Sequence, residues 1–138
     1  MPASPEKVAR IIGDLPNFGR LLGLRITVAD ADRVEAELEV TSALLNRNGM
    51  IHGGAIMAFA DTLGGTGTFL NLADGEGTVT VESKTNFFRA VAEGQMLRAV
   101  CLPLHRGRRT QVWQTTLTGP EGKLVAQVTQ TQMVLTKD

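Results

Sequence analysis

The sequence predicts an α+β fold in which one long central helix is wrapped by an antiparallel sheet of about six strands, after a short N-terminal helix. Three observations support this prediction. The segment from Gly53 to about Leu72 is apolar on almost every side, which is typical of a buried helix. The segment Arg33–Val40 alternates apolar and polar residues, the pattern of a half-buried strand. The later connections are short, which favours antiparallel pairing because parallel strands need long crossovers.

Length and composition indicate one globular domain over residues 1–138. Fourteen basic and fourteen acidic residues cancel, so the chain has no bulk charge with which to hold nucleic acid or an anionic membrane. Cys101 is the only cysteine, which excludes an internal disulfide framework and a thiolate metal cluster. The first ten residues are polar and lack the apolar stretch of an export signal, so we expect a cytoplasmic protein.

The N-terminal region is expected to form a short helix from Pro5 to about Asp14, which Pro16 and Gly19 interrupt. Three apolar residues then form a lead-in that we expect to pack under the domain: Phe18, Leu21 and Leu22. Two strands follow, Leu24–Ala29 and Arg33–Val40, with a turn at residues 30–32. We interpret the glutamates of the second strand as its solvated face.

Residues 41–52 are expected to form a loop before the long helix, which runs from Gly53 to about Asn71 or Leu72. Its one carboxylate makes a membrane span costly, so we place this helix inside the protein. Three glycines in its second half would each cost up to about 1 kcal/mol relative to alanine; they are Gly64, Gly65 and Gly67. Close packing in a dimer is one explanation, and a break in the helix near Gly64 is another.

The rest of the chain is predicted to be four strands in a meander: Thr78–Arg89, Gln95–Leu104, Arg109–Thr118 and Lys123–Leu135. Within the first, Val79, Val81, Ser83, Thr85 and Phe87 are expected on one face and Thr80, Glu82, Lys84 and Asn86 on the other. A tight hairpin is expected near Arg106-Gly107-Arg108, and a second turn at residues 118–122. One long helix wrapped by an antiparallel sheet in this order is a hot-dog fold.

Asp61 is the first candidate for chemistry, because it is the only charged side chain between His52 and Asp74. It lies on a helix that offers no polar face. A buried lone carboxylate costs several kcal/mol unless it is hydrogen-bonded or paired, and active sites tolerate such a cost. We therefore interpret Asp61 as a base or a nucleophile. The alternative is a capped or exposed aspartate at an interface.

His52 and Gly53 lie where the long helix is expected to begin. The first helical turn leaves N–H groups unpaired and carries a partial positive charge. Gly53 has no side chain to block a carbonyl group, so its N–H is a candidate oxyanion donor for a thioester. The alternative is that His52 caps the loop and the glycine pair allows close packing.

The distance between these two candidates predicts a dimer. Eight residues separate Gly53 from Asp61, which is roughly 12 Å along a helix. Groups that act on one carbonyl must reach atoms within about 3–3.5 Å of each other. If both act in one site, Asp61 comes from one subunit and Gly53 from another, in two composite sites related by a twofold axis.

The chain resembles the hot-dog acyl-CoA thioesterases of the phenylacetate-pathway (PaaI) type, which include a class of 4-hydroxybenzoyl-CoA thioesterase. The resemblance covers roughly residues 15–135 and rests on Asn46, His52-Gly53-Gly54, Asp61, Thr78–Phe88 and Phe88-Arg89-Ala90. Ala90 stands where the family commonly has proline. The resemblance implies hydrolysis of acyl-CoA by a dimer or a dimer of dimers, without metal or organic cofactor.

Carried over to this sequence, the resemblance implies that Asp61 is the base or nucleophile and that the Gly53 N–H polarises the thioester carbonyl. Asn46 and His52 would help to position the thioester and water, and Thr80 would hold the water. Four arginines are candidates for the CoA phosphates, because guanidinium binds phosphate in bidentate fashion; they are Arg89, Arg106, Arg108 and Arg109. An ordinary solvated hairpin is the alternative for the last three.

Two other functions stay open. One is a hydratase on the same fold. The hydratase pattern has a catalytic histidine on the central helix along with an aspartate, whereas here His52 lies only at the start of that helix. A non-catalytic acyl-CoA-binding protein would have the same fold, because function depends on the site. The acyl group, the thiol carrier, the choice of dimer or tetramer, and the choice between an anhydride and an activated water also stay open. Cys101 is interpreted as an inert thiol.

Overall fold

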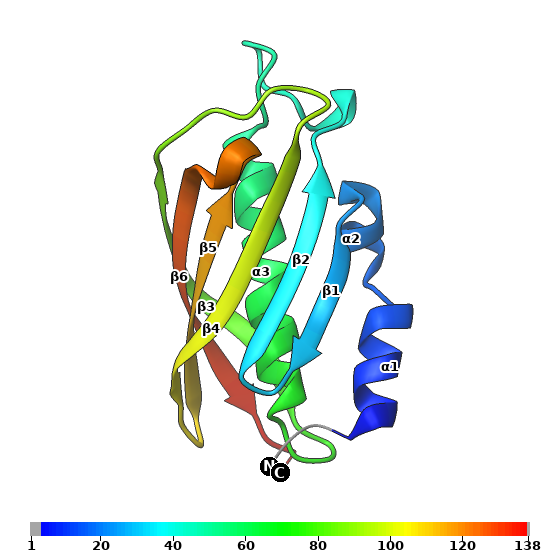
Figure 1. Cartoon of the computed structure of the whole chain (residues 1–138). Coiled ribbons are helices and arrows are strands. Elements are labelled where there is room, and N and C mark those ends of the chain that lie inside the picture. Colours follow the sequence, from blue (N-terminus) through cyan, green and yellow to red (C-terminus); the bar gives the residue numbers. More distant parts are fainter. Residues whose placement is uncertain (1–3, 138) are drawn as a thin grey trace.

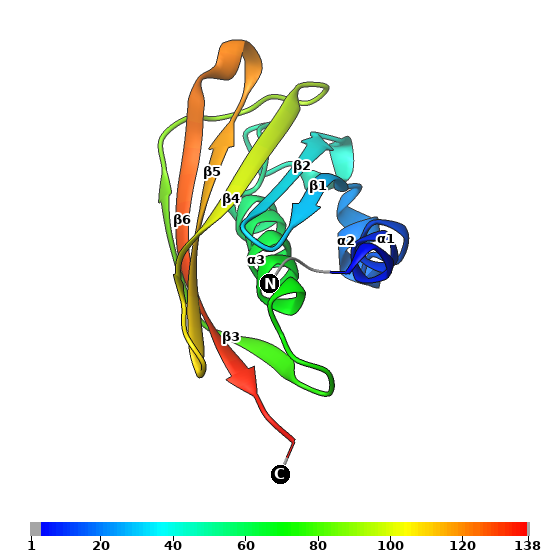
Figure 2. The ribbon, with the colours of Figure 1, turned by 60° about the horizontal axis from the view of Figure 1, so that its bottom comes forward.

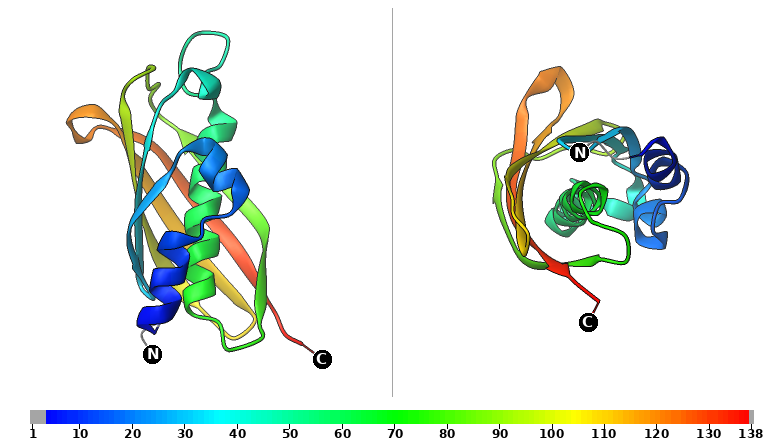
Figure 3. Two further views of the ribbon diagram at one scale, coloured as in Figure 1. Left: turned by 90° about the vertical axis from the view of Figure 1, so that its right-hand side faces the viewer. Right: turned by 90° about the horizontal axis from the view of Figure 1, so that it is seen from below.

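The computed structural model describes residues 4–137 and has the predicted hot-dog architecture (Figure 1). Its elements in chain order are α1 (Pro5–Gly13), α2 (Asn17–Leu22), β1 (Arg25–Asp30), β2 (Arg33–Glu39), a 3-10 turn (Ser42–Leu44), α3 (Gly53–Leu70), β3 (Gly77–Phe87), β4 (Met96–Arg106), β5 (Thr110–Thr118), a second 3-10 turn (Pro120–Gly122) and β6 (Leu124–Leu135). Seen along its axis, α3 lies in the middle, with the sheet around most of it and α1 and α2 on the remaining side (Figure 3).

The six strands form one sheet in the order β1-β2-β4-β5-β6-β3, and every neighbouring pair is antiparallel, as predicted. The prediction of a four-stranded meander after the helix was wrong for β3. Only β4, β5 and β6 follow one another in the sheet, whereas β3 lies beyond β6 at the edge (Figure 2). Alternation within a strand indicates which face is buried, but it does not identify the neighbouring strand.

A β-bulge in β3 changes which side chains face the helix. The register shifts between Thr80, which pairs with Gln132, and Glu82, which pairs with Thr131. Val81 is therefore the extra residue, and the face reverses there. As a result Thr80 lies on the same face as Ser83, and the predicted uninterrupted alternation was wrong.

The N-terminal segment forms the predicted helix α1 and then a second short helix, α2. In α2 Leu22 is buried, whereas the side chains of Phe18 and Leu21 are 58% and 77% exposed. The prediction that all three pack under the domain was therefore wrong for two of them. A six-residue helix can bury only one narrow stripe against α3, and here that stripe contains Gly19 and Leu22.

The central helix is continuous from Gly53 to Leu70, which excludes a break near Gly64 as the explanation for its glycines. Two of its glycines allow close packing within the chain. A Cβ atom on Gly64 would overlap the side-chain amide of Gln130, and one on Gly67 would lie 2.8 Å from the ring of Trp113. Gly65 differs, because a Cβ atom there meets no atom within 4 Å. None of the helices within residues 4–137 is long and apolar enough to cross a membrane.

These glycines lead to a paired stability prediction. We expect Gly67→Ala to lower the free energy of unfolding by about 1–2 kcal/mol, because the fully buried Trp113 ring must move to admit the methyl group. We expect Gly65→Ala to raise it by about 0.5–1 kcal/mol, because alanine is the better helix former and the space is open. Urea unfolding of the two variants and wild type measures both changes. Equal effects of the two substitutions would contradict the packing argument.

Candidate active site

Asp61 lies in the middle of α3 and its carboxylate is held by a threonine of β3. The Thr80 hydroxyl donates a hydrogen bond of 2.6 Å to Asp61 Oδ1. Asp61 is half-buried rather than buried, so the prediction of a helix with no polar face was wrong. The strip of α3 that contains Asp61, Thr62 and Thr66 is half-buried and borders a cavity.

Two buried glutamines of β6 continue the contact between Asp61 and Thr80. Gln132 Nε2 lies 2.6 Å from Thr80 Oγ1 and 2.8 Å from Gln130 Oε1. Gln130 Nε2 in turn donates to the Ala60 carbonyl at 2.8 Å. Neither glutamine was predicted from the sequence as a site residue. The available signal was two amides on the apolar face of a strand, in step with the buried Ala126 and Val128.

A cavity of about 710 Å³ lies between the N-terminal helices, α3 and the start of β3. Asp61, Thr80 and Gln132 line it on one side. Much of the remaining wall is apolar and comes from Ile11, Leu15, Pro16, Phe18, Phe69 and Val79. The cavity therefore places an apolar space directly beside a carboxylate, which suits a ligand with a reactive polar group and an apolar tail.

The first turn of α3 contains the other predicted site residues. The His52 Nδ1 atom accepts a hydrogen bond of 2.8 Å from the Gly54 N–H, so His52 is the N-cap of the helix. Because Nδ1 accepts, a neutral ring carries its proton on Nε2. The Asn46 Oδ1 atom accepts from the N–H groups of Asn48 and Met50, at 2.8 and 3.2 Å, and shapes the loop before the helix.

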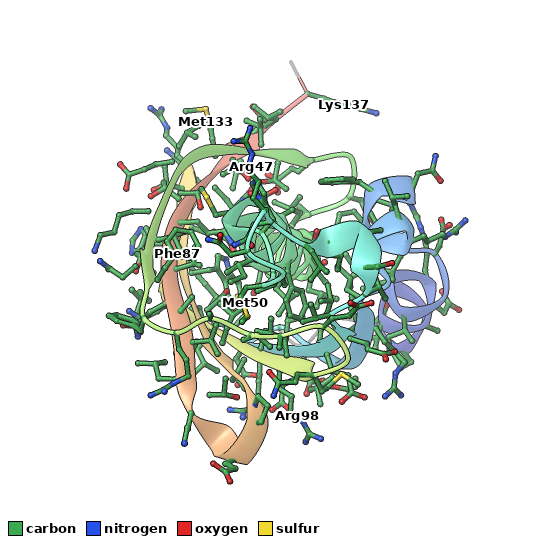
Figure 4. The ribbon with its side chains drawn as sticks, turned by 90° about the horizontal axis from the view of Figure 1, so that it is seen from above. Arg47, Met50, Phe87, Arg98, Met133 and Lys137 are labelled. Carbon is green, nitrogen blue, oxygen red and sulfur yellow. The ribbon has the colours of Figure 1, made fainter. Side chains whose placement is uncertain are left out.

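Within residues 4–137, the Gly53 N–H has no hydrogen-bond partner. A Cβ atom on Gly53 would lie 3.3 Å from the ring of Phe87, so this side chain lies beside Gly53. Viewed from this end of the molecule, Phe87 and Met50 lie on two sides of the start of α3 (Figure 4). The arrangement leaves one backbone donor available at the positive end of a helix.

The structure thus forms two clusters from the predicted residues. Asp61 and Thr80 lie together at mid-helix, and Asn46, His52 and Gly53 lie together at the helix start. Because α3 is continuous between Gly53 and Asp61, the two clusters are roughly 12 Å apart along the axis. One subunit does not bring the carboxylate and the proposed oxyanion donor to the same atom.

The four arginines that are candidates for the CoA phosphates lie at two opposite ends of the molecule. Arg89 lies two residues beyond Phe87, at the end of the molecule where α3 begins. Arg106 Nη1 donates to the Ala31 carbonyl at 3.2 Å, and the same oxygen accepts from Asn71, the C-cap of α3. The hairpin with Arg106, Arg108 and Arg109 therefore lies at the opposite end of α3 from Gly53 (Figure 1).

Two further observations concern alternative chemistry. Burial raises the pKa of the Cys101 thiol to about 12, so this cysteine is an inert core side chain. Among residues 4–137, no three His, Cys, Asp or Glu side chains lie close enough to share a metal ion.

Comparison with known proteins agrees with the fold and identifies a superfamily. Residues 48–126 match the model of the thioesterase superfamily. The chain is 37% identical over 102 residues to the proofreading thioesterase EntH of Cronobacter turicensis, covering 74% of each protein.

Solved structures have the same fold. The PaaI protein of the E. coli phenylacetic acid degradation operon superposes with a TM-score of 0.83 at 22% identity, over 93% of this chain and 91% of that one, which shows the fold alone. The smu.793 protein of Streptococcus mutans was solved bound to acetyl CoA. It superposes with a TM-score of 0.77 at 28% identity, over 83% of this chain and 90% of that one.

Proposed function

The chain belongs to the thioesterase superfamily, and from this premise we propose that it hydrolyses an acyl-CoA thioester to the free acid and CoA. The observation that carries the proposal is the half-buried carboxylate of Asp61, which borders an apolar cavity and accepts a hydrogen bond from Thr80. A carboxylate beside a space for an acyl group is the arrangement that general-base or nucleophilic attack on a thioester requires.

In the general-base route, Asp61 takes a proton from a water molecule while the water oxygen attacks the thioester carbon. The C–S bond of the tetrahedral intermediate then breaks, and the proton passes to the leaving thiolate. In the nucleophilic route, an Asp61 oxygen attacks the carbon, the thiolate leaves, and water hydrolyses the resulting anhydride. In both routes Thr80 engages Oδ1 and leaves the second carboxylate oxygen for the reaction.

The carbonyl oxygen gains negative charge in either route, and we assign its stabilisation to the Gly53 N–H of a second subunit. The separation of Gly53 and Asp61 along α3 supports this assignment. The edge strand β3 supports a dimer as well, because it is 11 residues long and exposes apolar side chains, with Val81 52% and Phe87 51% exposed. Such an edge is a template for pairing with another copy. A tetramer built from two such dimers stays a prediction.

The groups around Asp61 and Gly53 are proposed to position the substrate. His52 Nε2–H and the Asn46 side-chain amide lie at the Gly53 end, where each has a donor suited to the thioester or the attacking water. The cavity of about 710 Å³ beside Asp61 is proposed to take the acyl group. A hydratase is disfavoured because α3 carries no histidine.

We propose that Arg89 binds a CoA phosphate, because it is exposed and lies at the Gly53 end of the molecule. Arg106, Arg108 and Arg109 stay predicted phosphate contacts that only another subunit could bring to the same site. We expect Arg89→Ala to raise KM for acyl-CoA about tenfold with little change in kcat, since a charged hydrogen bond contributes about 1.5–3 kcal/mol. Steady-state kinetics measures this change, and Arg106→Ala, measured beside it, tests the hairpin at the opposite end.

The same acyl group on N-acetylcysteamine, which has no phosphate, should show no effect of Arg89→Ala. An equal rise in KM with both substrates would mean that Arg89 acts on the acyl side or on the fold. An effect confined to Arg106→Ala would instead assign the phosphates to the hairpin.

Thiol release from a panel of aryl- and fatty-acyl-CoAs, followed with a chromogenic thiol reagent, tests the proposed function. Turnover that saturates with at least one acyl group supports a thioesterase and ranks the acyl groups. The absence of turnover on every substrate, with the protein folded, would favour a non-catalytic acyl-CoA-binding protein.

A further inference from the structure

We propose that Gln132 is a positioning residue that orients Asp61 through Thr80. This inference rests on the proposed function of Asp61. It concerns the group of residues hereafter called the glutamine chain: Asp61, Thr80, Gln132, Gln130 and the backbone carbonyl of Ala60. Its links measure 2.6, 2.6, 2.8 and 2.8 Å, in that order.

The glutamine chain has one direction, and a backbone group sets it. The Ala60 carbonyl can only accept, so the Gln130 side chain must present its NH₂ group there. The Oε1 atom of Gln130 is then left to face Gln132, and it can only accept. Gln132 must therefore present its own NH₂ group to Gln130, and the second proton of that group points to Thr80 Oγ1.

The direction decides where the Thr80 proton goes. The hydroxyl has one proton, and its oxygen already accepts from Gln132. Its proton is therefore free to be donated to Asp61 Oδ1. The Ala60 carbonyl thus fixes the orientation of the Gln130, Gln132 and Thr80 side chains. As a result the Asp61 carboxylate accepts a hydrogen bond from Thr80. Thr78 supports the orientation, since its hydroxyl lies 3.0 Å from both Gln132 Oε1 and the Met133 carbonyl.

The packing around the glutamine chain leaves space for its amides and aligns Thr80 with them. Gln130 is 0% and Gln132 is 1% exposed, and burying an amide without partners costs roughly 1–3 kcal/mol. Gly64 leaves the space that the Gln130 amide occupies. The bulge at Val81 places Thr80 opposite Gln132 and on the helix side of β3. These features have a common consequence, which is that one Asp61 oxygen is held and the other is left to react.

The experiment compares Gln132→Met, Thr80→Val and the double variant in the thiol-release assay, with Gln111→Met as the matched control. Gln111 pairs with Gln132 across β5 and β6, is 3% exposed, and bonds to Trp113 outside the glutamine chain. We expect Gln132→Met to lower kcat about tenfold and to change KM less than about twofold, since the lost interaction acts on the reacting group. Gln111→Met should leave both parameters near wild type.

The double variant distinguishes positioning from a general effect on the fold. If Gln132 acts through Thr80, adding Gln132→Met to Thr80→Val lowers kcat by less than about twofold more. Multiplicative losses in the double variant, or equal losses in Gln132→Met and Gln111→Met, would overturn the proposal. Should Gln132→Met not fold, Gln132→Glu has nearly the same volume. Its carboxylate competes with Asp61 for the Thr80 proton, so wild-type kcat in this variant would also overturn the proposal.

A second measurement does not need turnover, and so separates this inference from the proposed function. In proton NMR the Thr80 hydroxyl should exchange slowly with water in wild type, because it both accepts and donates a hydrogen bond. Its exchange should be faster in Gln132→Met and unchanged in Gln111→Met. Slow exchange that persists in Gln132→Met would contradict the proposal, whatever the enzyme does to acyl-CoA.

Discussion

Replacing Asp61 by asparagine is expected to lower kcat for thiol release by about 10³-fold, since general-base catalysis contributes about 10²–10⁴. Asparagine has the same shape, and its carbonyl oxygen can still accept the hydrogen bond from Thr80. The fold and the glutamine chain should therefore persist while the proton acceptor is lost. Steady-state kinetics with the best acyl-CoA of the panel, together with a thermal unfolding curve, measures both expectations.

The control for Asp61→Asn is Asp74→Asn, which removes an exposed carboxylate in the turn after α3. Its kcat should stay near wild type. If Asp61→Asn retained more than a tenth of wild-type kcat, Asp61 would be neither base nor nucleophile. A loss of kcat that accompanied a large drop in the unfolding midpoint would indicate a structural role instead.

Replacing Gly53 by proline is expected to lower kcat by about 10²–10³-fold, the usual cost of one lost oxyanion donor. Proline removes the N–H and adds a ring whose Cβ lies beside Phe87. Gly53 is the first residue of α3, a position that favours proline, and His52 before it has extended backbone angles of −67° and 134°. The lost N–H has no partner within residues 4–137, so folding should be unaffected. Gly53→Ala, which adds the same Cβ beside Phe87 and keeps the N–H, is the control.

A hybrid dimer then tests whether Asp61 and Gly53 act across subunits. An Asp61→Asn subunit paired with a Gly53→Pro subunit would contain one composite site with both changes and one with neither. We expect the purified hybrid, obtained by co-expression with two different tags, to recover about half of the wild-type activity per dimer. Each parent alone should remain nearly inactive. No recovery in the hybrid would mean that both groups act within one subunit, or that Gly53 is not the donor.

Several features of the fold were predictable because local chemistry encodes them. The predominantly apolar character of residues 53–72 predicts a buried helix wherever it lies in the chain. The alternation in β2 predicts a half-buried strand. Asp61 could be selected because a single carboxylate in an apolar helix needs an explanation. The distance from Gly53 to Asp61 follows from helix geometry alone.

The partners of these residues were not predictable, because they depend on contacts between distant segments. The position of β3 at the sheet edge depends on β4 occupying the place beside β2. The bulge at Val81 depends on the register against β6, and it reversed the face on which Ser83 lies relative to Thr80.

The sequence by itself determined the kind of fold and selected Asp61 as a candidate for the site, because periodicity, helix rise and the cost of a buried charge are local properties. Only the tertiary structure decided what holds Asp61 in place. Thr80, which bonds to it, lies 19 positions further along the chain, and Gln132 lies 52 positions beyond Thr80. Nothing in the sequence around either residue indicates its partner. The packing of α3 against β3 and β6 brings these groups within hydrogen-bond distance of one another.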